Sequence, residues 1–160
     1  MEHWTDFAVI TGGAAAALVG LLFVSVSIRA DVIAKSKGLR SRLAQILTIF
    51  LGILGSCILV ALPNPAEWVL GIELIVAALA LGAAFIVLDH RAERGGDRVP
   101  LETVLDRLNP NVTTAVLIGL AGITLLFGIT AGLFFLALAA LVAFVGGAIG
   151  AWLVLVRPEG

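Results

Sequence analysis

The sequence predicts an all-α integral membrane protein, a single domain that forms a bundle of about five transmembrane helices. Three observations predict this fold: an extreme apolar composition, apolar runs of membrane-spanning length, and basic residues confined to alternate connections. Hydrophobic residues make up 61% of the 160 residues and charged residues only 13%, whereas roughly a quarter of the residues in a soluble domain are charged. The mean hydropathy is +1.14. Much of this apolar sequence must therefore face lipid.

The apolar runs divide the chain into five expected spans. A helix rises about 1.5 Å per residue and the hydrocarbon core is about 30 Å thick, so about 20 residues cross it once. One run, residues 112–156, is roughly twice that length and must fold back on itself. Gly128 and Gly132 lie in its middle and suit a turn. The expected spans are 7–28, 43–62, 68–88, 112–129 and 133–156.

The basic residues predict the orientation of the chain. All ten Lys and Arg residues lie in three places: within 29–42, within 91–107, and at 157. These segments follow the first, third and fifth spans, so five crossings place all of them on one side of the membrane. Cytoplasmic segments carry an excess of Lys and Arg. We therefore expect a multi-pass protein of the cytoplasmic membrane, with the N-terminus outside and the C-terminus inside. The acidic N-terminus does not resemble a signal peptide, so the first span is expected to be retained.

The connections carry helix-start signals. Asn-Pro pairs at 64–65 and 109–110 place a capping residue and a first-turn proline at the start of the third and fourth spans. Between these spans, residues 100–108 show apolar positions at helical spacing. This pattern predicts a short amphipathic helix on the inner membrane surface. A solvated turn is the alternative.

The residue types that carry catalysis are scarce in the expected spans. Cys57 is the one cysteine, and the spans hold no His, Lys or Arg that would activate a nucleophile. His3 and His90 fall on opposite sides of the membrane in this topology, so they do not share a metal ion. The sequence has no phosphate-binding glycine loop and no metalloprotease motif, and a net charge of −1 does not favour nucleic acid. We expect neither an enzyme nor a bound cofactor or metal.

Two acidic residues are candidates for an ion or pore site. Glu73 is the one ionisable residue inside an expected span, where a buried charge costs roughly 2.5–3.5 kcal/mol at mid-bilayer. It lies only about 7–8 Å below the outer boundary. It is therefore either an ion or proton site, or an interfacial carboxylate that hydrogen-bonds locally or reaches outward. Asp6 lies on the same side, which has no basic residue. Acids from several subunits would concentrate cations at the mouth of a pore.

Small and polar residues recur at spacings of three and four in the first and second spans. Such faces let membrane helices approach closely and form hydrogen bonds with each other. We expect them to pack helices or to face a pore, and their abundance favours a homo-oligomer. The candidate residues are Gly13, Ala17, Gly20, Gln45, Thr48 and Gly52.

The first half of the chain resembles a known family. Residues 12–28, which read GGAAAALVGLLFVSVSI, are similar to the first span of a family of small bacterial membrane proteins sometimes labelled modulator of FtsH protease. Segments 40–62 and 71–74 are similar to the same family. The resemblance implies a bacterial inner-membrane protein that acts as the regulatory partner of another protein, and it implies no catalytic or binding residue.

Two functions are therefore open from the sequence. The first is a homo-oligomeric cation channel or pore, lined by the first span, with Asp6 and Glu73 near its outer mouth. The alternative is a non-conducting regulatory or scaffold partner of a larger membrane complex, such as a membrane-bound protease. The scarcity of charge in the spans argues against a proton-coupled transporter.

Overall fold

A computed structural model describes residues 2–28, 30–63, 66–93 and 110–156, and every regular element in these ranges is helical. The elements are α1 (Glu2–Ile28), α2 (Ala30–Lys35), α3 (Lys37–Ala61), α4 (Glu67–Glu93), α6 (Pro110–Leu126), a 3-10 turn η2 (Thr130–Gly132) and α7 (Leu133–Val156). Four helices, α1, α3, α4 and α7, are long and apolar enough to cross a membrane. The fourth expected span is the shorter apolar helix α6, whose 17 residues measure about 26 Å.

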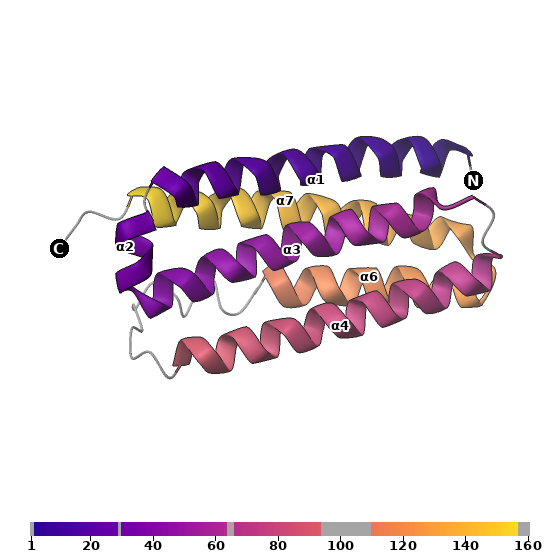
Figure 1. Cartoon of the computed structure of the whole chain (residues 1–160). Coiled ribbons are helices and arrows are strands. Elements are labelled where there is room, and N and C mark those ends of the chain that lie inside the picture. The colour runs from indigo at the N-terminus through magenta and orange to yellow at the C-terminus, as the bar shows by residue number, and fades with distance from the viewer. Residues whose placement is uncertain (1, 29, 64–65, 94–109, 157–160) are drawn as a thin grey trace.

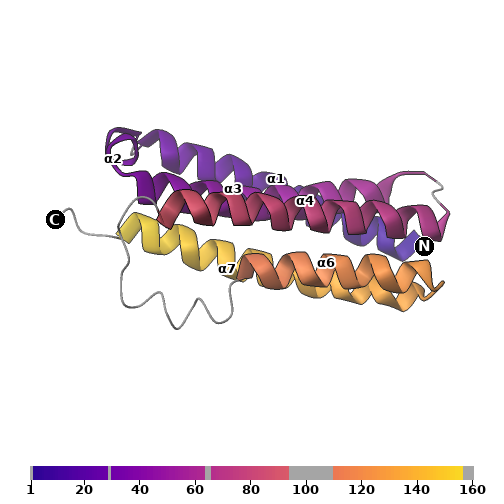
Figure 2. The ribbon, with the colours of Figure 1, turned by 90° about the horizontal axis from the view of Figure 1, so that it is seen from below.

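The helices form two layers (Figures 1 and 2). Helices α1, α3 and α4 lie side by side in one layer, while α6 and α7 form the other. The principal contacts join α4 to α6, α1 to α3, α6 to α7, α3 to α4 and α3 to α7. Helix α3 is therefore the central element, since it touches both neighbours in its own layer and α7 in the other.

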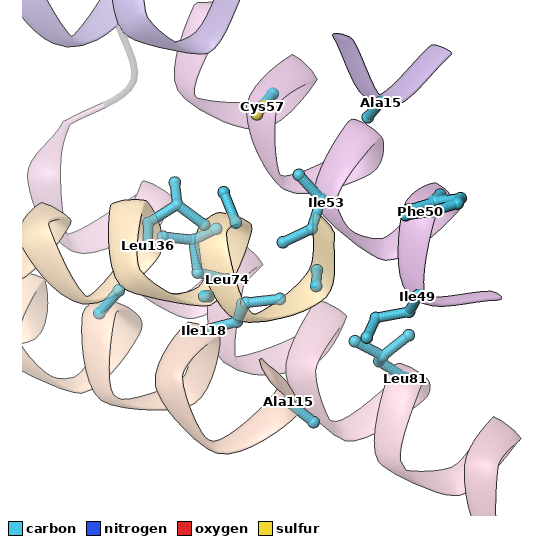
Figure 3. Close-up of a cluster of buried hydrophobic side chains, with 14 of the residues drawn as sticks. Ala15, Ile49, Phe50, Ile53, Cys57, Leu74, Leu81, Ala115, Ile118 and Leu136 are labelled. Carbon is cyan, nitrogen blue, oxygen red and sulfur yellow. The ribbon is translucent and has the colours of Figure 1, made fainter. Parts of the chain in front are cut away.

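The core is apolar, and so is the outside of the bundle. Ile53, Leu74 and Leu136 come from three different helices and are completely buried where the layers meet (Figure 3). On the outer surface, Ile10 is 73% exposed and Leu79 is 70% exposed. Exposure of large apolar side chains over the long helices is the arrangement expected for contact with lipid. The structure thus supports a membrane protein.

The long apolar run folds back at the predicted glycines. Helix α6 ends at Leu126, and Gly128 has a positive φ of 71°, a conformation that glycine adopts without a steric penalty. The backbone N–H of Ile129 then donates to the carbonyl of Thr124 at 3.0 Å. A Cβ added to Gly132 would overlap the Thr124 side chain. Both glycines are therefore required by the local geometry of the turn.

The helices extend beyond the apolar runs. Helix α3 begins at Lys37 instead of residue 43, because Ser36 caps it by accepting a hydrogen bond from the backbone N–H of Leu39 at 3.3 Å. An apolar run marks the part of a helix in hydrocarbon, whereas backbone hydrogen bonds continue into the polar interface. The expected surface helix at 100–108 and the Asn residues of both Asn-Pro pairs lie outside the described residues.

The long helices alternate in direction (Figure 1). Helix α1 begins at the end of the bundle where α3 leads to α4 and where α6 turns into α7. At the opposite end α1 leads through α2 into α3, and α4 and α7 end, whereas the shorter helix α6 begins nearer the middle of the bundle. The first will be called the N-terminal end of the bundle, and the second the basic end, because the basic segment 29–42 lies there.

Candidate functional site

The candidate residues of the first span lie on the outer face of α1. Gly13, Ala17 and Gly20 are exposed, and Asp6 continues their stripe seven residues before Gly13. A Cβ added at Gly13 or Gly20 would meet no atom within 4 Å. The opposite side of α1 is buried, with Ala15 0% exposed. We call the residues Asp6, Gly13, Ala17 and Gly20 the α1 outer face.

Aromatic contacts fix the start of α1 against the second layer. The Trp4 ring packs edge-on against Phe7 at a centroid distance of 5.7 Å and against Phe134 of α7 at 5.0 Å. Aromatic pairs in this geometry contribute about 0.5–1.5 kcal/mol beyond their buried area. Asp6 lies two residues after Trp4, so its backbone is held at the N-terminal end of the bundle while its side chain remains exposed.

The candidate residues of the second span make their contacts mainly inside the chain. Gly52 packs on α4, because a Cβ there would lie 2.8 Å from Cδ1 of Leu81. The Thr48 hydroxyl donates to the carbonyl of Ala44 at 2.7 Å within α3. Gln45 and Thr48 are both half-buried. Gly52 therefore packs two helices of the chain together, whereas a Cβ at Gly13 or Gly20 of the α1 outer face would meet no described atom within 4 Å.

Glu73 is half-buried near the start of α4, and its Oε2 atom is buried without a hydrogen-bond partner among the described residues. Glu73 and Asp6 both lie toward the N-terminal end of the bundle, but α3 separates α4 from α1 (Figure 1). The chain therefore does not bring these two carboxylates together. Asp6 belongs to the α1 outer face, and Glu73 does not.

The structure adds two features that the sequence analysis did not single out. Gly71 of α4 and Gly122 of α6 meet backbone to backbone, since a Cβ at either position would lie 2.8 Å or 2.6 Å from the other's carbonyl oxygen. Ala115, Gly119 and Gly122 show the three- and four-residue spacing of a small-residue face, a pattern that is consistent with a close helix contact but does not by itself locate one. Thr114, in the core, is 0% exposed, and its hydroxyl has no partner in the described structure. No pattern in the sequence marks it.

No group of three His, Cys, Asp or Glu side chains in the described ranges is placed to hold a metal ion. Cys57 is buried in the core, where its Cβ lies close to Gly12 of α1. In the described part of the chain, the candidate functional elements are therefore the exposed α1 outer face and two separate carboxylates, Asp6 and Glu73. Compared with protein-family models, curated proteins and solved structures, the chain shows no significant match.

Proposed function

We propose that the chain is a five-span protein of the bacterial cytoplasmic membrane, with its N-terminus outside, that self-associates through the α1 outer face and conducts cations between subunits. The exposure of Gly13 and Gly20 carries this proposal. A helix face that meets only lipid tails gains nothing from glycine, which weakens a helix by about 1 kcal/mol relative to alanine. Between helices, glycine allows the close backbone approach on which membrane association depends.

Side chains fill the centre of the described bundle, which supports a path between subunits. Ile53, Leu74 and Leu136 meet at the centre of the described bundle with no exposed surface. Interiors packed in this way have few voids larger than a water molecule. A cation path would therefore follow the outer surface of α1 in an assembly of several copies.

Asp6 would form the entrance to that path. It lies in line with Gly13 and Gly20 and is exposed, so each copy would contribute one carboxylate to a ring. Rings of acidic side chains favour cation entry. Glu73 would act apart from this ring, as an interfacial carboxylate whose buried oxygen takes a hydrogen bond from a lipid or a neighbouring subunit.

A non-conducting partner role is the second candidate, and the filled interior also favours it. In this case the α1 outer face would dock on a helix of an unlike membrane protein, as the resemblance to modulators of a membrane-bound protease implies. Such a protein would show no cation flux above empty liposomes and would co-purify with a larger membrane complex. Liposomes containing the purified protein test conduction directly.

The topology is tested by labelling single cysteines with a membrane-impermeant thiol reagent in whole cells. Cys57 is 2% exposed, so the unaltered chain should not react. In a Cys57→Ala background, Thr5→Cys should label from outside. Gly96→Cys should label only after the cells are opened. Labelling of both positions in intact cells would exclude the five-span orientation.

Self-association is tested by Gly20→Leu, with Ala14→Leu as the matched control. Both positions are exposed on α1, but Ala14 lies off the α1 outer face. Overpacking costs about 1–3 kcal/mol, so Gly20→Leu should weaken the oligomer about tenfold or more, as measured by the mass of the detergent-solubilised protein against concentration. Ala14→Leu should associate normally. Equal behaviour of the two variants would mean that this face contacts lipid.

A further inference from the structure

A separate apolar cavity lies at the basic end of the bundle, between the end of α1, the short helix α2 and the start of α3. Its volume is about 310 Å³, at the lower end of the range for ligand pockets, about 300–1,000 Å³. Its apolar lining includes Leu22, Val26, Ile33, Leu43 and Leu47. Along α3 the lining extends from Arg40 to Leu47, about 10 Å. That is roughly two-thirds of one leaflet of a hydrocarbon core about 30 Å thick.

Helix α2 contributes one side of the cavity. Ile33, its one described contribution to the lining, is only 9% exposed. The turn that follows is fixed by a hydrogen bond from the backbone N–H of Ser36 to the carbonyl of Ile33 at 3.3 Å. Phe23 of α1 also lines the cavity and is 57% exposed. The cavity is therefore open to the surroundings of the bundle beside Phe23, where lipid would lie if the long helices cross a membrane.

The charge around the cavity identifies the ligand. Among the described residues of the lining Arg40 is the one with a charge, and it is exposed. In the sequence, residues 29–42 hold five basic residues against one acid, Asp31. Basic pockets between transmembrane helices bind the headgroups of anionic lipids. An apolar slot about two-thirds of a leaflet long, with a guanidinium at one end, matches part of an acyl chain joined to a phosphate, because arginine forms paired hydrogen bonds with phosphate oxygens.

We infer that this cavity is a binding site for an anionic glycerophospholipid, with one acyl chain among the apolar side chains and the phosphate on Arg40. A bound lipid would join α1, α2 and α3 at a place where direct side-chain packing leaves a gap. The site does not depend on conduction, and it lies at the opposite end of the bundle from Asp6.

Delipidated protein in detergent, titrated with phosphatidylglycerol or with phosphatidylcholine of the same chains, tests the assignment by native mass spectrometry. The unaltered protein should retain one phosphatidylglycerol at least about fivefold more strongly than phosphatidylcholine. This ratio corresponds to about 1 kcal/mol, since 1.4 kcal/mol is tenfold. Glycerol phosphate without chains should not bind measurably. Equal retention of the two lipids, or binding of the chainless headgroup, would overturn the proposal.

Two variants distinguish lipid binding in the cavity from lipid attraction by the positive surface charge at the basic end. Arg40→Gln should remove the preference for phosphatidylglycerol. Arg42→Gln removes the same charge two residues away, at a position outside the lining, and should keep the preference. An equal loss in both variants would assign the lipid to surface charge and exclude the cavity.

Filling the cavity tests the acyl chain independently. Ala44 is half-buried in the lining, so Ala44→Phe should abolish retention of both lipids. The smaller change Ala44→Leu should weaken retention of both lipids. It provides the test if Ala44→Phe does not fold. A melting curve in detergent establishes that each variant is folded. Full retention in a folded Ala44→Leu or Ala44→Phe protein would exclude a chain in this cavity.

Discussion

Gly122→Ala should lower the melting temperature of the purified protein by several degrees. Helix α6 packs on α4 in the most extensive helix contact of the bundle, and the two backbones meet at Gly71 and Gly122. An added Cβ at residue 122 would lie 2.6 Å from the Gly71 carbonyl oxygen and 2.8 Å from Cγ1 of Ile75. Backbone atoms do not move aside as a flexible side chain does, so the helices must separate. Overpacking of this kind costs about 1–3 kcal/mol, at about 2–4 °C per kcal/mol for a chain of this size.

Gly119→Ala is the matched control for this prediction. It changes the same residue type on the same helix, three positions away, and its Cβ would meet only Cβ of Ala78 at 3.6 Å, an ordinary van der Waals distance. Both variants gain the same intrinsic helix propensity, about 1 kcal/mol, so the difference between them measures the clash alone. Gly119→Ala should melt at or above the temperature of the unaltered protein. If the two variants have the same melting temperature, the backbone contact between Gly71 and Gly122 does not stabilise the packing of α4 on α6.

The positions of the helices could be predicted because the bilayer imposes a length. About 20 apolar residues are needed for each crossing, and that requirement alone located α1, α3, α4 and α7. It also required the run 112–156 to turn, and the turn lies at Gly128, where a positive φ favours glycine. The helix ends could not be predicted in the same way. Residues 37–42 are mostly polar or charged, yet they belong to α3, because Ser36 caps the helix before the apolar run begins.

The direction in which each small-residue face points could not be predicted. Gly20 and Gly52 belong to stripes with the same spacing, but Gly20 faces outward and Gly52 packs on Leu81. In a soluble protein the polar side of a helix identifies the outside. Here lipid and core are equally apolar, so the sequence of one helix does not distinguish them. For the same reason the sequence does not show that the Thr114 hydroxyl is buried, because its helix is apolar on every side.

The positions of the two candidate carboxylates were likewise predicted only in part. The sequence correctly indicated that Asp6 and Glu73 lie toward one end of the bundle, because both positions follow from span length and direction. It did not indicate that α3 separates their helices, since the order of helices around a bundle depends on side-chain packing. Asp6 therefore remains in line with the α1 outer face, and Glu73 does not. This separation makes Glu73 a control for Asp6.

Asp6→Asn should reduce cation flux into liposomes about tenfold at low ionic strength, whereas Glu73→Gln should leave the flux unchanged. Both substitutions keep the shape of the side chain and remove one negative charge. Only Asp6 lies in the proposed path, where a ring of carboxylates raises the local cation concentration, and fields of this kind change entry rates by about 10- to 1,000-fold. The flux is measured with a cation-sensitive dye inside the liposomes, against empty liposomes.

Salt separates an electrostatic role of Asp6 from a structural one. The Debye length is about 30 Å at 0.01 M salt and about 3 Å at 1 M. The deficit of Asp6→Asn should therefore shrink toward zero as salt is raised, because screening removes the field that the carboxylate supplies. A deficit that persists at 1 M salt would mean that the substitution disturbs the assembly instead. Equal losses in Asp6→Asn and Glu73→Gln would contradict a path along the α1 outer face.

If the unaltered protein gives no flux for several cations and voltages, conduction is excluded. Binding of a stoichiometric membrane partner through Gly13, Ala17 and Gly20 then becomes the function to test.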